Sequence, residues 1–338
     1  MQPLKNPIQQ RADCKPGQIP QDVLQSSEPI LLKGFAHEWP IVQAGIESPQ
    51  KAADYLRSLY NGQLVFTAYG EPSIKGRVFY NDDMSGFNCQ AVKASLHQIL
   101  DRIFKHADDP TPPTIYVAST EVNSWLPGFA NQNSAGLDEW QPLTNIWIGN
   151  RSRIAAHYDF PNNLACCAVG KRRYTLFPPE QVANLYVGPM ELSPGGRDIS
   201  LVDFANPDFA KFPKFEQALQ AAQVADLDAG DALYLPGMWW HHVEALTPFN
   251  VLITHWWRDS PAFMGRPENA LELAILSLRN LPPAQRKAWK ALFDHYIFEH
   301  QPGDQDHIPD DRKGMLSQPL TPMEARKLRA ELLNKLKV

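Results

Sequence analysis

Two short segments of the sequence carry side chains that can bind a metal ion. His157 and Asp159 stand two residues apart in RIAAHYDFPNN, and a histidine pair, His241 and His242, follows later in GMWWHHVEAL. Residues i and i+2 of a β-strand project to the same face, so the imidazole of His157 and the carboxylate of Asp159 can supply two neighbouring ligands. The spacing predicts a metal centre that a histidine of the second segment completes.

Strand alternation selects one histidine of the pair. His241 shares a face with Val243 and Ala245, whereas His242 shares one with Glu244. An apolar face turns toward a barrel interior, so we expect His241 to be the ligand and His242 its outward neighbour. Two histidines and one carboxylate leave three adjacent coordination positions open, which is the arrangement of non-haem Fe(II) oxygenases.

A structural role for the same residues is the competing interpretation. His157 can pair with Asp159 at a surface, and the neighbouring tryptophans can be ordinary core residues. The chain also contains a second His-x-Asp triplet, His106-Ala107-Asp108, which ends a helical pattern and runs into the loop sequence ADDPTPP. We interpret that triplet as part of a solvated loop, and it shows that one such spacing has little weight by itself.

The elements that position these residues are mostly strands. From about residue 113 the chain shows short β-branched and aromatic segments separated by turn residues, typical of a sandwich or a jelly-roll barrel. Gly230, in the turn between two of them, predicts that they pair as antiparallel neighbours. The predicted strands are 114–120, 144–149, 153–159, 164–169, 173–178, 222–228, 231–236, 241–246 and 250–257. Helices are expected between them at 179–186 and 213–222.

The flanking regions differ from this pattern. The first 112 residues mix predicted strands (28–34, 63–70, 76–82) with amphipathic helices (49–62, 90–106), and the chain beyond Pro261 is helical (267–280, 282–298, 321–338). We therefore expect an α/β N-terminal region (1–112) packed on a barrel (113–260), and a C-terminal helical region (261–338).

The last predicted helix has an apolar stripe without an evident partner. It begins with a capping box, in which Thr321 is the N-cap and Glu324 follows three residues later, and Leu328, Leu332 and Leu336 then repeat every four residues. Such a stripe packs either on the chain's own barrel or on another subunit. Both arrangements stay open at this point.

Composition narrows the class of protein. The chain has 338 residues and a net charge of -5, and it has no basic block, so we expect no non-specific binding to DNA. It has neither a signal-peptide core nor an apolar run of about 18 residues, which predicts a cytoplasmic protein that does not span a membrane. The four cysteines (Cys14, Cys89, Cys166 and Cys167) form no CxxC pair, as expected for reduced thiols.

The combined motifs resemble a known family. HYDFPNNLACCAVGKRRYTLFPPEQVANLY, GDALYLPGMWWHHVEAL and THWW are similar to the JmjC-type, cupin-like Fe(II)/2-oxoglutarate oxygenases, above all to their asparaginyl hydroxylases and bacterial cupin-like members. The resemblance covers roughly residues 113–260, and EPILLKGFAHEWP is similar to the family's N-terminal segment. It implies a mainly β protein whose core is a double-stranded β-helix (a jelly-roll or cupin barrel).

The resemblance also implies roles for individual residues. His157, Asp159 and His241 match the iron ligands, Asn163 matches an asparagine near the co-substrate, and Tyr116 matches a tyrosine that hydrogen-bonds a 2-oxoglutarate carboxylate.

The matching position for the basic residue that grips the distal carboxylate, usually a lysine, is Arg172 here, with Lys171 adjacent. Strand alternation places Arg172 with Tyr174 on an inward face, which favours Arg172 over Lys171. Two further positions depart from the family: Ile154 replaces a threonine near the co-substrate, and His255 stands where an asparagine precedes the closing aromatic pair.

The resemblance therefore implies a 2-oxoglutarate-dependent dioxygenase that acts as a hydroxylase, with Fe(II) as cofactor and 2-oxoglutarate as co-substrate. By resemblance, a protein or peptide side chain is the first candidate substrate, followed by a small molecule or a modified tRNA base. The same resemblance implies a homodimer formed through the C-terminal helices. The alternatives are a metal-dependent cupin that does not use 2-oxoglutarate and a non-catalytic cupin-like binding module.

Overall fold

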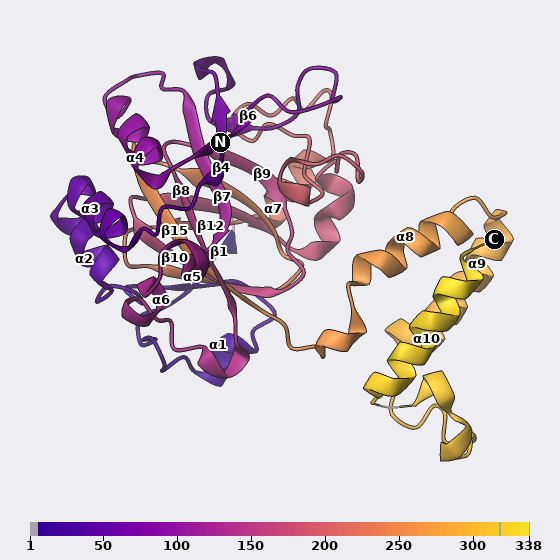
Figure 1. Ribbon diagram of the computed structural model, residues 1–338. Coiled ribbons are helices and arrows are strands. Elements are labelled where there is room, and N and C mark those ends of the chain that lie inside the picture. Colours follow the sequence, from indigo (N-terminus) through magenta and orange to yellow (C-terminus); the bar gives the residue numbers. More distant parts are fainter. Residues whose placement is uncertain (1–5, 318, 338) are drawn as a thin grey trace. The chain divides into compact units, whose positions relative to one another are not determined.

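The structure is a computed structural model that describes residues 6–317 and 319–337 (Figure 1). The chain divides into two compact units, Met1–Arg258 and Asp259–Val338. The first contains every strand of the described chain, and its N-terminal strands belong to the same sheets as the barrel strands.

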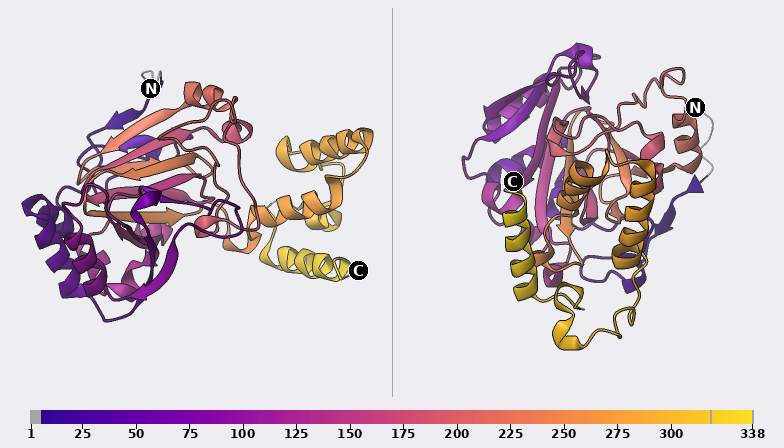
Figure 2. Two further views of the ribbon diagram at one scale, coloured as in Figure 1. Left: turned by 90° about the horizontal axis from the view of Figure 1, so that it is seen from above. Right: turned by 90° about the vertical axis from the view of Figure 1, so that its right-hand side faces the viewer.

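Two mixed sheets form the first unit (Figure 2). The smaller sheet has the spatial order β1-β12-β11-β14-β9-β5, with bounds β1 Asn6–Pro7, β12 Gln223–Leu227, β11 Arg172–Phe177, β14 Trp240–Ala245, β9 Arg153–His157 and β5 Arg77–Val78. The larger sheet has the order β2-β3-β13-β10-β15-β8-β7-β4-β6, with bounds β2 Gln9–Arg11, β3 Ile30–Leu32, β13 Ala232–Leu235, β10 Asn162–Val169, β15 Asn250–Trp257, β8 Leu143–Gly149, β7 Thr114–Glu121, β4 Val65–Gly70 and β6 Gln90–Ala94.

Consecutive strands from β9 onward mostly alternate between the two sheets. β10, β13 and β15 belong to the larger sheet, while β9, β11, β12 and β14 belong to the smaller one. Strands β9–β15 pair only with antiparallel neighbours among themselves, and their exchange between two facing sheets is the topology of a jelly roll, which confirms the cupin-like fold class.

The pairing expected across Gly230 is wrong. β12 pairs with β11, while β13 pairs with β10 and β3 in the other sheet. Gly230, with φ +96°, forms a corner rather than a hairpin: its N–H donates to the carbonyl of Cys167 (2.8 Å), and its own carbonyl accepts from the N–H of Ala36 (2.7 Å). These bonds attach the corner to two other segments, an arrangement that local turn residues do not reveal.

Helices surround the sheets. In the first unit they are α1 Gln21–Leu24, α2 Pro40–Glu47, α3 Pro49–Leu59, α4 Leu96–Lys105, α5 Val122–Trp125, α6 Phe129–Gln132 and α7 Phe215–Ala221. The helix expected over 90–106 is correct only in its second part, because 90–94 form β6. Ser95 separates the two elements: its hydroxyl accepts from the N–H of Gln98 in a capping box that starts α4.

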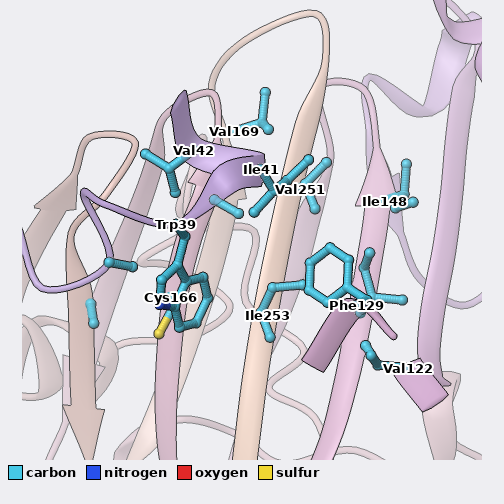
Figure 3. Close-up of a cluster of buried hydrophobic side chains, with 14 of the residues drawn as sticks. Trp39, Ile41, Val42, Val122, Phe129, Ile148, Cys166, Val169, Val251 and Ile253 are labelled. Atoms are coloured by element: carbon cyan, nitrogen blue, oxygen red, sulfur yellow. The ribbon is translucent and has the colours of Figure 1, made fainter. Parts of the chain in front are cut away.

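The outer face of the larger sheet is covered by helices and loops. Figure 3 shows Ile41 and Val42 of α2 near Val169 and Val251 of the sheet, and Trp39, the residue before the helix, beside Cys166. A Cβ atom on Gly45 of α2 would lie 3.0 Å from the Val169 side chain, so this helix approaches the sheet closely. This layer packs on the face of the larger sheet that points away from the barrel interior.

The barrel interior lies between the inner faces of the two sheets. Ala165 and Cys167 of β10 point into it, as do Tyr174 of β11 and Val243 of β14, while the alternate residues of these strands pack on the outside. The observed alternation agrees with the inward face predicted for β11 and β14.

The segment 178–222 covers the outer face of the smaller sheet. It begins with the 3-10 helix Pro179–Asn184, where a helix over 179–186 was expected, and it ends with α7. Leu185 and Phe215 of this segment pack on Phe177 and Trp240 of the sheet.

The second unit is helical, as predicted. It contains α8 Pro267–Leu278, α9 Pro283–Phe293 with a π-helical turn Asp294–Phe298, and α10 Pro322–Lys335. The capping box of α10 is confirmed: the hydroxyl of Thr321 accepts from the N–H of Glu324 (3.3 Å), and the Glu324 carboxylate accepts from the N–H of Thr321 (2.9 Å). Val338, the last residue of the predicted helix, lies outside the described residues. Within the described chain, no helix combines the length and the apolar character needed to cross a bilayer.

Candidate metal centre

Three side chains from the two sequence motifs meet at one end of the barrel. His157 is the last residue of β9 and lies directly opposite His241 of β14, with ring centroids 4.2 Å apart. Asp159 follows two residues after the end of β9. One potential ligand atom from each of the three side chains lies within 4.8 Å of the others, and no other cluster of three or more such residues was found among residues 6–317 and 319–337.

Backbone carbonyls orient both imidazoles. Nδ1 of His157 lies 2.9 Å from the carbonyl oxygen of Ala155, and Nδ1 of His241 lies 3.0 Å from that of Trp239. A carbonyl can only accept, so each Nδ1 carries the proton and each Nε2 keeps a free lone pair. This is how metal-binding histidines are usually held by the groups behind them.

The carboxylate of Asp159 has two different surroundings. Its Oδ2 lies 3.7 Å from Nε2 of His241, while its Oδ1 lies 3.2 Å from Nε of Arg197. One oxygen thus faces the histidines and the other faces a cation. Sequence reasoning missed Arg197, because it belongs to the long segment 178–222 and no motif spacing connects it to Asp159.

Burial keeps His241 neutral. The residue is 4% exposed, and removal from water, followed by the nearby His157, lowers its pKa to about 4. A neutral imidazole is the form that binds a metal, so His241 needs no deprotonation step near neutral pH.

The residues present fit an Fe(II) ion. Two neutral imidazoles and one carboxylate are the donor set of non-haem Fe(II) sites. One potential ligand atom from each of the three side chains lies within 4.8 Å of the others, so a single ion could contact all three.

His242 lies on the opposite face of β14, as predicted. It does not reach solvent, because the segment 178–222 covers it, and the ring of Phe204 lies 4.5 Å from its own. Burial, with the charge of Arg153 as the next cause, lowers its pKa to about 3. His242 is therefore a buried neutral side chain outside the barrel.

Arg172 is a buried cation that points into the barrel. Its side chain is on the same face of β11 as Tyr174, the residue is 3% exposed, and it pairs with no carboxylate of the described chain. Its Nε also lacks a hydrogen-bond partner among the described residues. Burial raises the pKa of Tyr116 and of Tyr174, and in both cases the positive charge of Arg172 opposes that rise, so both phenols lie close to the guanidinium.

Lys171 lies outside the barrel. Its side chain is 63% exposed, and its Nζ forms an ion pair with Oδ1 of Asp228 at 2.9 Å. It occupies the turn between β10 and β11, where alternation does not turn a side chain inward. The structure thus separates the two cations that stand together in the sequence.

Tyr116 and Asn163 both face the interior from the larger sheet. The ring of Tyr116 stacks on Trp147, with centroids 6.3 Å apart. Asn163 is 4% exposed, and no described residue donates a hydrogen bond to its Oδ1. Asn163 pairs across the sheet with Trp256, which therefore faces the same side.

His255 does not join the other candidates. It lies on the outer face of β15, where its ring meets Trp39 (6.0 Å between centroids) and its Nδ1 lies 3.3 Å from the carbonyl of Leu164. A shift of one residue along a strand exchanges the two faces, so its neighbours Thr254 and Trp256 point inward instead. The expectation that His255 contributes to the co-substrate site is therefore wrong, because its side chain faces away from the barrel interior.

The inward face of β15 includes residues that the motifs did not reveal. The indole N–H of Trp147 donates to Oγ1 of Thr254 (2.9 Å), and the ring of Trp256 lies 5.9 Å from that of Trp147. Ile154 packs against the interior core, at the position where the family has a threonine.

Comparison with known proteins relates this geometry to a family. Residues 16–263 match the family model described as a cupin-like domain. The chain is 32% identical over 117 residues to lysine-specific demethylase JMJ31 of Arabidopsis thaliana, covering 34% of this chain and 21% of that protein. It is 26% identical over 238 residues to JmjC domain-containing protein D of Dictyostelium discoideum, covering 65% of this chain and 49% of that protein. The matches thus span about a fifth to a half of these relatives.

A solved structure is also similar. The crystal structure of the Escherichia coli ribosomal oxygenase YcfD aligns over 94% of this chain and 67% of that chain, with 16% sequence identity and a TM-score of 0.40.

Proposed function

Because the chain belongs to the cupin-like domain family, we propose that it is an Fe(II)- and 2-oxoglutarate-dependent oxygenase that hydroxylates a side chain of a protein or peptide. One observation carries this proposal: a two-histidine, one-carboxylate group and a buried arginine that pairs with no carboxylate among the described residues belong to the same barrel interior. The first suits iron, and the second suits a carboxylate ligand that enters the barrel.

The proposed iron ligands are Nε2 of His157, Nε2 of His241 and Oδ2 of Asp159. The hydrogen bonds from both Nδ1 atoms to backbone carbonyls hold the rings in place before the metal arrives. Bound iron would supply the redox chemistry that couples decarboxylation of 2-oxoglutarate to oxidation of a C–H bond. The contact between Arg197 and Oδ1 leaves Oδ2 as the oxygen available to the metal.

Arg172 supplies the binding partner for the distal carboxylate of 2-oxoglutarate. An unpaired charge inside a protein costs free energy, so an arginine buried without a carboxylate is expected to receive one from a ligand. Its planar guanidinium can form two parallel hydrogen bonds with that carboxylate. The phenol of Tyr116 lies near the same guanidinium and can donate a third.

The surrounding residues give the site an apolar lining and exclude water from it. Ala165, Leu176 and Val243 line the interior with apolar side chains, and Trp147 is fixed by Thr254. Excluding water strengthens the charge pairing with Arg172 and protects reactive species from side reactions.

The proposed substrate class follows from the family resemblance. Relatives differ in what their names state: one is a lysine-specific demethylase and another, from Gallus gallus, is tRNA wybutosine-synthesizing protein 5, which is 32% identical over 130 residues, 38% of this chain and 33% of that protein. A protein or peptide side chain is our first candidate, and a small molecule or a tRNA base is the alternative.

Anaerobic titration tests the proposal. Fe(II) and then 2-oxoglutarate are added to the full-length protein, and a weak visible charge-transfer band is expected when the chelate forms. Iron binding without that band would favour a metal-dependent cupin that does not use 2-oxoglutarate. Absence of metal binding would favour a non-catalytic binding module. Succinate formation in air, with and without candidate peptides, then tests turnover.

A further inference from the structure

The strand pairing fixes only two of the three candidate ligands. His157 and His241 are direct partners on β9 and β14, so the ladder sets their separation. Asp159 lies beyond the end of β9, in the segment that leads to β10, and no strand ladder positions its backbone. Something else must hold that segment beside His241.

The turn between β13 and β14 contacts this segment through two consecutive backbone amides. The N–H of Met238 donates to the carbonyl of Asp159 (2.7 Å), and the N–H of Gly237 donates to Oδ1 of Asn162 (3.0 Å). The same turn leads directly into β14 and His241. The two hydrogen bonds therefore join the segment that carries one ligand to the turn that carries another.

Two residues of this turn, Gly237 and Met238, have conformations that allow its backbone to lie close to the Asp159 segment. A Cβ atom on Gly237 would lie 2.4 Å from the carbonyl oxygen of Phe160, so only glycine lets the two backbones approach. Met238 adopts a left-handed conformation (φ +71°) although its side chain is 40% exposed and gains little from burial. Such a conformation persists in a residue with a side chain only where its surroundings impose it.

We propose that Asn162 is a positioning residue for the metal centre: its side-chain oxygen fastens the Gly237–Met238 turn to the segment of Asp159 and so sets the distance between Asp159 and His241. This inference rests on the proposed metal-dependent function. It concerns a different residue from its neighbour Asn163, which faces the barrel interior. Of the two hydrogen bonds, the one to Asn162 is the only one that a side-chain substitution can remove.

The alternative is that Asn162 contributes to folding alone. In that case its loss would lower the stability of the protein without changing the affinity of the folded protein for metal. Groups that orient the ligands of a metal typically change metal affinity by about 10- to 100-fold when they are removed. Metal affinity of the folded protein therefore distinguishes the two roles.

The test is a titration of the full-length protein with Mn(II), followed by calorimetry, and with Co(II), followed by its visible d–d spectrum. Asn162→Ala is expected to weaken Mn(II) binding by about 10-fold and to alter the Co(II) spectrum. Asn162→Asp keeps an oxygen that accepts from Gly237 and should restore the wild-type spectrum. Asn61→Ala removes a similar hydrogen bond, in which Oδ1 of Asn61 accepts from the backbone N–H of Gln63 (3.1 Å) outside the metal centre, so it is the matched control and should bind as the wild type does.

Gly237→Ala tests the same contact sterically. Its Cβ would push the turn away from Phe160, and we expect weaker metal binding even though Asn162 is intact. Circular dichroism of each variant confirms that the protein measured is folded, and Gly237→Ala provides the comparison if Asn162→Ala does not fold.

Wild-type affinity and spectrum in folded Asn162→Ala, or in folded Gly237→Ala, would overturn the inference while leaving the proposed function intact. Equal weakening in Asn162→Ala and Asn162→Asp would also overturn it, because the acceptor would then be irrelevant. If the wild-type protein itself binds neither metal, the proposed function fails and this inference fails with it.

Discussion

His157 and His241 lie directly opposite each other on antiparallel strands, and both direct Nδ1 at a backbone carbonyl. Nε2 of each ring is therefore free to bind a metal, and Nε2 of His241 lies 3.7 Å from Oδ2 of Asp159. Two residues far apart in the sequence reach this arrangement because β9 and β14 are neighbours in the smaller sheet. The geometry is set by backbone contacts that do not depend on a bound metal.

The choice between the two adjacent histidines is directly testable. His241→Ala should abolish tight Fe(II) binding, because it removes one of three ligands inside the barrel. His242→Ala should leave metal binding largely intact, because that ring packs against Phe204 on the other face of the sheet. Anaerobic calorimetric titration measures both affinities, and loss of metal in His242→Ala alone would show that the ligand assignment is wrong.

Arg172 gives a second prediction. Arg172→Ala should weaken binding of 2-oxoglutarate to the metal-loaded protein by roughly 2–4 kcal/mol, the range for losing one partner of a desolvated charge pair. Lys171→Ala is the matched control and should have little effect, since that side chain is exposed and paired with Asp228.

Both variants should bind iron as the wild type does, and titration of 2-oxoglutarate into each metal-loaded protein gives the comparison. Equal affinities for the wild type and Arg172→Ala would mean that another group holds the carboxylate, or that 2-oxoglutarate is not the co-substrate.

Strand alternation explains which parts of the site could be read from the sequence. It placed His241, His242 and Arg172 on the correct faces, because each belongs to a regular strand whose neighbours have a clear inward pattern. It could not do so for His255, since β15 is buried on both faces and its sequence, NVLITHWW, lacks polar alternation. A strand of this kind gives no signal of which side faces the interior.

Contacts between distant segments were beyond sequence reasoning. Arg197 reaches Asp159 from the long covering segment, and Gly230 turns a corner between sheets instead of closing a hairpin. Both positions depend on how the chain returns in space, whereas turn residues and spacing report only local conformation. The capping box at Thr321, in contrast, could be predicted from the sequence, because all of its atoms belong to one helical turn.

His255 predicts a pH dependence of stability. Burial lowers its pKa to about 4, while an unfolded histidine titrates near about 6.5. The unfolded state thus binds the proton more tightly, so the contribution of His255 to stability is full above about pH 6.5 and is lost as the pH falls toward 4. Between pH 7 and pH 5, protonation of His255 should lower the free energy of unfolding by about 2 kcal/mol.

Urea unfolding of the wild type and of His255→Asn at both pH values isolates this share. Other buried histidines, such as His242, lower the stability of both proteins over the same pH range. The effect of His255 is therefore the difference between the two plots of unfolding free energy against pH. Parallel profiles would show that His255 is not the buried neutral group that its position against Trp39 indicates.

The C-terminal helices carry the last prediction, which is homodimerisation. Among the described residues of the second unit only Gln305 and Ala325 are buried, whereas Leu276, Phe298 and Met323 are each more than 70% exposed. Helices with so much exposed apolar surface need a partner. Along α10, Leu332 and Leu336 continue the stripe that begins at Leu328, and both are exposed.

We expect light scattering of the full-length protein to give the mass of a dimer, and a chain truncated at Pro319, which lacks α10, to give that of a monomer. Replacing both exposed leucines of the stripe, Leu332→Glu with Leu336→Glu, should have the same effect, because burying two carboxylates in an apolar contact is costly. Asn334→Glu adds a charge to another face of the same helix and should leave the dimer intact. A monomer for full-length protein at all concentrations would mean that the stripe packs within its own chain, and an unchanged dimer after both leucine substitutions would place the interface elsewhere.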